Sequence, residues 1–106
     1  MASPQCERGY TKIATELLKE IYFRITNPTH LRLLLFTIRF TYGYNRRDFD
    51  TNLTSIGKAL RLTPEYCRDM LIDISENRRI LKVEWKSLKI VNISVVKDYE
   101  KWQIEK

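Results

Sequence analysis

The sequence is poor in the residues that build metal centres and disulfide frameworks. It has two cysteines, Cys6 and Cys67, and a single histidine, His30. Two cysteines are too few for a disulfide framework, and a four-ligand zinc site would need carboxylates to complete it. We therefore expect no metal site, and we expect Cys67 to be a small buried residue on a helix.

Motifs for catalysis and cofactor binding are also missing. The chain has only three glycines, no glycine-rich phosphate loop and no Gly-x-Ser-x-Gly turn, and its histidine has no cysteine or serine near it in sequence. Its acidic residues fall on the surfaces of expected helices. We expect no catalytic residues, no cofactor and no enzymatic activity.

Long hydrophobic runs and a leader are lacking as well. The longest apolar stretch, Leu33–Phe36, is soon interrupted by Thr37, whereas a helix that crosses a bilayer needs about 20 apolar residues. The first residues lack the order of a signal peptide, a charged region followed by an apolar one. These features predict a cytoplasmic protein that does not associate with a membrane.

What the chain has is an excess of positive charge. Its 106 residues include 19 lysines and arginines against 13 acidic residues, for a net charge of +6. This length suits one domain with one modest core. A basic balance favours an anionic partner, although the positions of the charges are more informative than their total.

Apolar residues recur at helical spacing in four segments, which we expect to be helices: 15–24, 28–42, 55–60 and 64–77. Asn27 followed by Pro28 is a strong helix start, and Thr63 followed by Pro64 repeats it. The helix over 28–42 is apolar nearly all round, so we expect it to be the buried centre of the domain.

The ends of these helices are also predicted. Thr11 or Thr15 should cap the first helix, and Thr54 should cap the third. Gly43 should end the second helix as the residue after its C-cap. Arg39, on the second helix, is expected to be an ion-pair partner within the fold.

Strand signals lie on both sides of the last two helices. A short strand is expected near 49–53, and the alternation of 81–85 with the return over 90–95 predicts a β-hairpin across 81–95, turning at Lys86–Lys89. Trp85 should face the core, and Trp102 should anchor the end of the chain. A hairpin directly after two helices joined by a short turn is the layout of a winged helix-turn-helix.

The predicted fold class is therefore α+β, mainly α with a small β-hairpin wing. We expect a flexible lead over 1–9, the winged-helix domain over 10–102 and a tail over 103–106. Gly57 supports the helix-turn-helix, because glycine in a helix interior costs about 1 kcal/mol and usually allows a close approach.

Three segments carry a resemblance to a known family. They are Gly9–Ile13 with the Glu-Leu-Leu after it, Ile38–Asn45 with its Arg-x-Thr-Tyr-Gly, and Val96–Trp102 with its Asp-aromatic-x-x-Trp. The chain resembles the N-terminal winged-helix domain of bacteriophage replication protein O. The resemblance implies binding of double-stranded DNA at a replication origin, and contact with replication proteins through a further part that follows this domain in the family. A homodimer is compatible with that role.

Charge is unevenly spread over the expected DNA-binding elements. Residues 63–76 carry one arginine against four acidic residues, whereas residues 78–97 carry six basic residues against Glu84 alone. We therefore expect the wing and the loop before the first strand to supply most of the attraction for phosphates. The predicted DNA contacts are Arg46, Arg47, Thr63, Tyr66, Arg68, Arg78, Arg79, Lys82, Lys86 and Lys89.

Two other functions fit the same fold. One is a winged-helix transcription regulator of a phage or mobile element, which the fold cannot separate from a replication initiator. The other is a protein-interaction winged helix that presents the acidic helix over 64–77 to a basic partner. Salt dependence of binding to random duplex DNA separates the last from the others.

Overall fold

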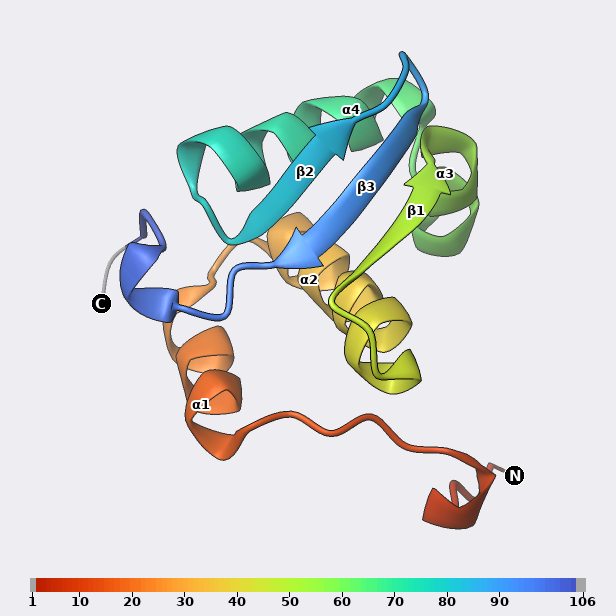
Figure 1. The fold of residues 1–106 in the computed structure, drawn as a ribbon, viewed down its shortest axis with the longest axis vertical. Coiled ribbons are helices and arrows are strands. Elements are labelled where there is room, and N and C mark those ends of the chain that lie inside the picture. Colours follow the sequence, from red (N-terminus) through yellow and green to blue (C-terminus); the bar gives the residue numbers. More distant parts are fainter. Residues whose placement is uncertain (1, 105–106) are drawn as a thin grey trace.

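The computed structural model describes residues 2–104 and forms the predicted winged helix. Figure 1 shows a small sheet lying in front of α2 and α4, with α1 below them. In chain order the helices and strands are α1 (Thr15–Arg24), α2 (Pro28–Thr41), β1 (Asp48–Asn52), α3 (Leu53–Leu60), α4 (Pro64–Ile72), β2 (Leu81–Trp85) and β3 (Ile90–Val95). A π-helical turn, Asp73–Asn77, extends α4, and short 3-10 turns cover Cys6–Arg8, Tyr42–Tyr44 and Tyr99–Lys101.

The sheet joins the wing to the rest of the domain. Strands β2 and β3 form the hairpin, and β1 pairs antiparallel with the outer side of β3, giving the order β1-β3-β2. In this register Asn52 lies opposite Ile90 and Asp48 opposite Ser94. The wing turn is therefore next to the end of β1, and the loop that precedes β1 lies at the opposite end of the sheet.

Helix α2 is buried along one side, as expected, but its other side is open. Leu33, Leu34 and Ile38 lie in the core, whereas Leu35 and Arg39 are exposed. The expectation of an ion pair at Arg39 is wrong: its guanidinium lies 4.7 Å from the centre of the Phe40 ring, over the aromatic face.

The helix starts with proline are confirmed, and three other helix ends differ from the prediction. Asn52, and not Thr54, caps α3, because its Oδ1 accepts a hydrogen bond from Ser55 N at 2.8 Å. Helix α1 begins after Ala14 without a side-chain cap. The 3-10 turn extends α2 past Gly43, and Asn45 takes the left-handed conformation with φ 54°. Asparagine tolerates that conformation better than most residues.

The last described residues are tied to α1 by a buried arginine. Arg24 donates from Nη1 to the carbonyl of Tyr99 at 2.6 Å and from Nη2 to that of Ile104 at 3.1 Å, and it lies over the ring of Trp102. Trp102 is buried and donates from Nε1 to Val96 O. Trp102 is therefore an anchor, as predicted, while Trp85 is half-buried against the core.

Gly57 lies at the crossing that defines the helix-turn-helix. The chain turns back at Arg61, in the left-handed conformation with φ 58°, and Leu62 N donates to Gly57 O at 2.9 Å. A Cβ added at Gly57 would lie 2.6 Å from the carbonyl oxygen of Leu62, a backbone atom that cannot move independently of the turn. Only glycine fits this position without a shift of α4.

Replacing Gly57 should therefore destabilise the domain although a larger residue favours helix. We expect Gly57→Leu to lower the free energy of unfolding by about 1–3 kcal/mol through overpacking. Urea denaturation measures it, with Ala59→Leu as the matched control, since Ala59 is exposed in the same helix. An unfolding midpoint equal to that of the parent would show that the crossing is not tight.

Candidate nucleic-acid interface

The side chains predicted to contact DNA lie in four places: the wing turn, the start of α4, the start of β2 and the loop before β1. Lys86 and Lys89 are in the wing turn, which lies at the same end of the molecule as the start of α4 (Figure 1). Arg78, Arg79 and Lys82 lie where β2 begins, at the other end of the hairpin. Arg46 and Arg47 precede β1, beyond the strand end that is far from the wing turn.

The wing turn is held rigidly by hydrogen bonds of its own. Lys86 N and Ser87 N both donate to Ile90 O, and Ser87 Oγ accepts from Ile90 N at 3.1 Å. Leu53 N, at the start of α3, donates to Lys89 O at 3.0 Å. This last bond fixes the wing to the helix-turn-helix, so the two can contact one surface as a unit.

The two wing lysines are not equally available. Lys86 Nζ lies 3.2 Å from Asp50 Oδ1, and both side chains are about half exposed. A hydrogen bond from Asn92 and another from Lys86 lower the pKa of Asp50, so its carboxylate is charged near neutral pH. Among residues 2–104, Lys89 has no acidic partner within ion-pair distance. Lys89 is thus the freer cation of the turn.

The start of α4 presents a short polar edge. Thr63 Oγ1 accepts a hydrogen bond from Tyr66 N at 3.2 Å as the helix cap, and Tyr66 Oη lies 3.4 Å from Thr29 Oγ1 of α2. Both residues therefore have structural contacts, although both remain partly accessible. Arg68 is exposed and has no ion pair among the described residues. Arg68 is the side chain of this edge best placed to reach a partner.

The acidic character of α4 is smaller on its outer side than the sequence suggests. Glu65, Asp69 and Glu76 are exposed, but Asp73 faces α2, where its Oδ2 lies 2.8 Å from His30 Nε2. The imidazole and the carboxylate are within ion-pair distance, but their relative orientation is not that of a hydrogen bond. Asn77 Nδ2 donates to the other oxygen of Asp73 at 2.7 Å.

His30 is a buried residue of the α2–α4 interface, 3% exposed. Burial lowers the pKa of His30 below its ordinary value, and the nearby Asp73 carboxylate opposes the shift. The hydrogen bond from Asn77 lowers the pKa of Asp73. A neutral imidazole beside a charged carboxylate is the arrangement that these shifts favour near neutral pH.

The basic residues at the start of β2 border a shallow cavity. Arg79 takes the left-handed conformation, with φ 55°, in the bend between the π-helical turn and β2. Arg79, Lys82 and Lys101 line a cavity of about 490 Å³ with Glu76. These cations can contribute long-range attraction, but they lie away from the wing turn.

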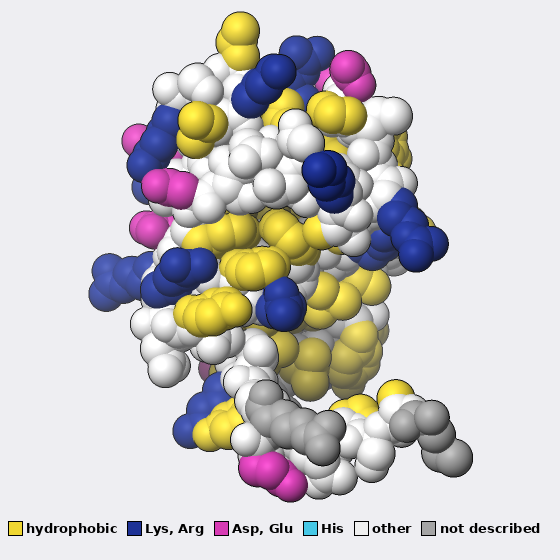
Figure 2. All heavy atoms as spheres, turned by 90° about the vertical axis from the view of Figure 1, so that its right-hand side faces the viewer, with side chains coloured by type: hydrophobic (Ala, Val, Ile, Leu, Met, Phe, Trp, Pro, Cys, Tyr) yellow, Lys and Arg dark blue, Asp and Glu magenta, His cyan; other side chains and the backbone are white. Residues whose placement is uncertain are grey.

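Arg46 belongs to a cluster of aromatic rings. Its Nε donates to Phe40 O at 2.7 Å, and its guanidinium lies over Tyr44 at 5.2 Å and over Phe49 at 5.8 Å. Figure 2 shows hydrophobic side chains exposed in the middle of this side of the molecule, with lysine and arginine side chains around them. The apolar pattern of 28–42 predicted burial for Phe36 and Phe40, but nothing in the sequence indicated that Tyr44 and Phe49 would join them in one cluster.

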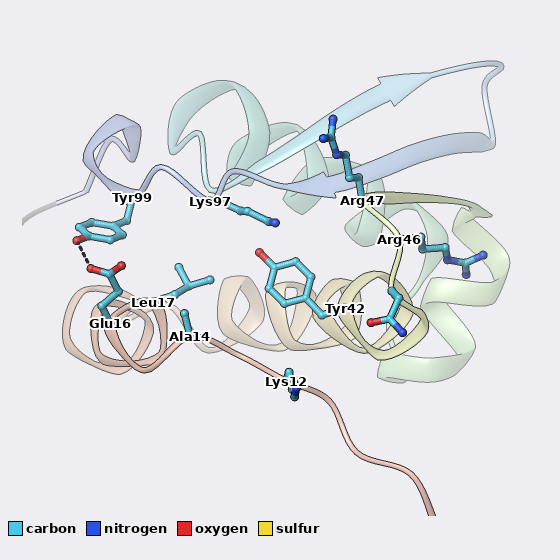
Figure 3. A pocket seen from close by; sticks show the side chains of 10 residues that line it. Lys12, Ala14, Glu16, Leu17, Tyr42, Arg46, Arg47, Lys97 and Tyr99 are labelled. Carbon is cyan, nitrogen blue, oxygen red and sulfur yellow. Dashed lines mark hydrogen bonds between the residues drawn. The ribbon is translucent and has the colours of Figure 1, made fainter.

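A basic cavity of about 510 Å³ adjoins this cluster (Figure 3). Its lining comes from the lead before α1, the first turn of α1, the turn and loop after α2, and the segment after β3: Lys12, Ala14, Glu16, Leu17, Tyr42, Asn45, Arg46, Arg47, Lys97 and Tyr99. Lys97 Nζ lies 5.2 Å from the centre of the Tyr42 ring. Lys12 and Lys97 were not predicted as functional, because only the fold brings them beside the Tyr42–Arg47 segment.

Other kinds of site were also sought in the described part of the chain. Within residues 2–104, no group of three or more His, Cys, Asp or Glu side chains could hold a metal ion. Both cysteines are free, with Cys6 exposed and Cys67 buried. None of the helices formed by these residues is long and apolar enough to cross a membrane.

Comparison with known proteins gives one match. The family model described as bacteriophage replication protein O matches residues 3–102, nearly the whole chain. The matched span includes every helix and strand of the fold. No curated protein and no solved structure matches at a significant level.

The pairing of His30 with Asp73 predicts how stability depends on pH. Because the pKa of His30 is lowered in the fold, the unfolded chain takes up more protons as the pH falls below about 6.5, and stability should decrease. We expect the melting temperature to fall between pH 7.5 and 5.5, and the imidazole to titrate below pH 6.5 by NMR. His30→Gln should flatten this dependence, since the chain has no other histidine. An unchanged slope in His30→Gln, or an imidazole that titrates above 6.5, would contradict the assignment.

Proposed function

The chain belongs to the bacteriophage replication protein O family, and we propose that it binds double-stranded DNA at a replication origin. Membership gives it a role in DNA replication. In the proposal the domain recognises and holds DNA without chemistry of its own. Contact with other replication proteins, in this proposal, is made outside the winged-helix domain.

The observation that carries the proposal is the rigid connection between the wing turn and the helix-turn-helix. The hydrogen bond from Leu53 to Lys89 and the crossing at Gly57 both use α3, so α3 sets the positions of α4 and the wing together. A winged helix reads base edges with its second helix in the major groove. In this arrangement the wing turn contacts the neighbouring phosphates through Lys89 and Lys86.

The charges on α4 determine how that helix can enter the groove. The exposed acids extend from Glu65 in its first turn to Glu76 in the π-helical turn after it, and they repel phosphates wherever they approach the DNA backbone. Entry by the N-terminal end keeps Glu76 away from the DNA and brings Arg68 and Thr63 closest to it. Glu65 can then accept a hydrogen bond from a cytosine amino group, whereas Arg68 suits guanine.

The same exposed acids favour one alternative function. Glu65 and Asp69 of α4 and Glu76 of the π-helical turn form an acidic strip that could face a basic protein instead of DNA. A DNA-binding domain and a protein-binding domain differ in the effect of salt on duplex affinity, which decides between them.

The wing lysines give the first test. Replacing Lys86 and Lys89 by alanine should weaken binding to every duplex about equally and reduce the slope of log affinity against log salt by about two. Of the two single variants, Lys89→Ala should weaken binding more than Lys86→Ala, because the Lys86 ammonium is already paired with Asp50. Fluorescence anisotropy at several salt concentrations measures both quantities, with Lys19→Ala in α1 as the control. Absence of salt-sensitive binding by the parent would favour the protein-binding alternative.

Helix α4 gives the second test. Arg68→Ala should change which sequences are selected from random duplex DNA, while Asp69→Asn should strengthen non-specific binding by about threefold, since it removes a charge that repels phosphates. Asp73 is unsuitable for this purpose because it contacts His30 and Asn77. If Asp69→Asn leaves duplex affinity unchanged and Arg68→Ala leaves the selected sequences unchanged, α4 does not face the DNA.

A further inference from the structure

A second face of the domain combines open aromatic rings with arginines. We call it the aromatic–arginine face; its members are Phe36, Arg39, Phe40, Tyr44, Arg46 and Phe49. The Phe40 and Tyr44 rings are stacked, with centroids 6.1 Å apart and planes at 13°, and Phe40 also stacks on Phe49 at 5.4 Å. Phe49 is buried, so it attaches this group of rings to the core.

The face is fixed in place and open to solvent. The hydrogen bond from Arg46 Nε to Phe40 O holds that guanidinium over Tyr44 and Phe49. Arg39 covers Phe40 from α2. Tyr44 is nevertheless 59% exposed, with only part of its ring covered. Phe36 and Phe40 are half-buried beside it, so the open apolar surface is centred on Tyr44. An apolar surface rimmed by cations is a candidate interaction site.

The basic cavity described above continues this face through Asn45–Arg47. Lys12 and Lys97 line it from two other segments, and Figure 3 shows Lys97 and the Tyr42 hydroxyl directed toward each other across its interior. The hydroxyl is buried and has no hydrogen-bond partner among the described residues. A phosphate group in this cavity would lie beside the Lys97 ammonium.

Charge restricts the occupant of these two surfaces. Among residues 2–104, Arg39, Arg47, Lys12 and Lys97 have no carboxylate within ion-pair distance, while Glu16 is bonded to the Tyr99 hydroxyl. The partner should therefore be anionic. A second copy of the chain is disfavoured, because a symmetric contact would set these cations against themselves.

The aromatic rings restrict the choice of partner further. Rings can stack on bases only where the bases are unpaired, and a basic groove beside stacking rings is how proteins bind single strands without sequence preference. We propose that the aromatic–arginine face and the adjoining basic cavity bind single-stranded DNA, with a base on Tyr44 and backbone phosphates at Lys12 and Lys97. The choice of a nucleic acid over an acidic protein rests on the role in replication, where strands are separated next to bound initiators.

This site is distinct from the proposed duplex interface. Arg46 and Arg47 precede β1 at the end of the sheet opposite the wing turn, so they serve the single strand in this arrangement. One domain could then hold the origin duplex at one end and an exposed strand at the other.

Binding of a labelled 20-nucleotide oligothymidylate to the whole chain tests the stacking part. Tyr44→Ala should weaken this binding about tenfold, and Tyr44→Trp should preserve it. Tyr22→Ala is the matched control, because Tyr22 is a 72% exposed tyrosine on α1. Duplex affinity should not change in any of these variants.

Paired lysine variants test the phosphate part and separate the two sites. Lys12→Ala with Lys97→Ala should reduce the salt slope for oligothymidylate by about 1.4, at about 0.7 for each contact, and should leave the duplex slope unchanged. Lys86→Ala with Lys89→Ala should reduce the salt slope for duplex and leave the slope for oligothymidylate unchanged.

Three outcomes would overturn the inference. The first is binding of duplex but not of oligothymidylate by the parent at low salt, which leaves the proposed function standing. The second is an equal loss of oligothymidylate binding in Tyr44→Ala and Tyr22→Ala. The third is displacement of the oligonucleotide by polyglutamate at equal charge concentration with the same dependence on Tyr44, which would identify an acidic protein as the occupant.

Discussion

The close contact between Gly57 and the turn after α3 is the constraint on which the DNA-facing part of the structure depends. It sets the angle at which α4 leaves α3, because the Leu62 carbonyl occupies the space of a side chain at Gly57. The other end of α3 receives the wing through the hydrogen bond from Leu53 to Lys89. Helix α4 and the wing turn, which are distant in sequence, are thus both positioned by α3. A shift at the crossing would move the helix start and the wing turn relative to each other.

Positive charge is distributed to both ends of the sheet, and this explains why a single basic patch does not describe the molecule. The wing turn carries Lys86 and Lys89, whereas Arg46 and Arg47 lie beyond the far end of β1. Net charge attracts nucleic acid from a distance, but contact geometry decides what each end can bind. Lysines on a rigid turn suit phosphates of a duplex, while arginines stacked on open rings suit unpaired bases.

Local signals in the sequence predicted the elements of the fold well, since a proline after Asn27 or Thr63 marks a helix start by its own chemistry. What the sequence could not predict are contacts between distant residues. Helical spacing placed Asp73 near the outer acids, yet the packing of α2 against α4 turns it toward His30. Asn52, and not Thr54, caps α3, because the helix begins at Leu53, two residues before the predicted start at 55. The aromatic–arginine face likewise depends on β1 bringing Phe49 beside the end of α2.

The most direct test of the account is to map a bound duplex on the domain by NMR. Backbone amide signals of the ¹⁵N-labelled protein would be followed during titration with an origin-derived or selected duplex. The account predicts that the largest shifts fall on the wing turn, the start of α3 and the first turns of α4, while the amides of Tyr44–Arg47 change little. Shifts centred on the exposed acids near Glu76, or on the Tyr44–Arg47 segment, would contradict it.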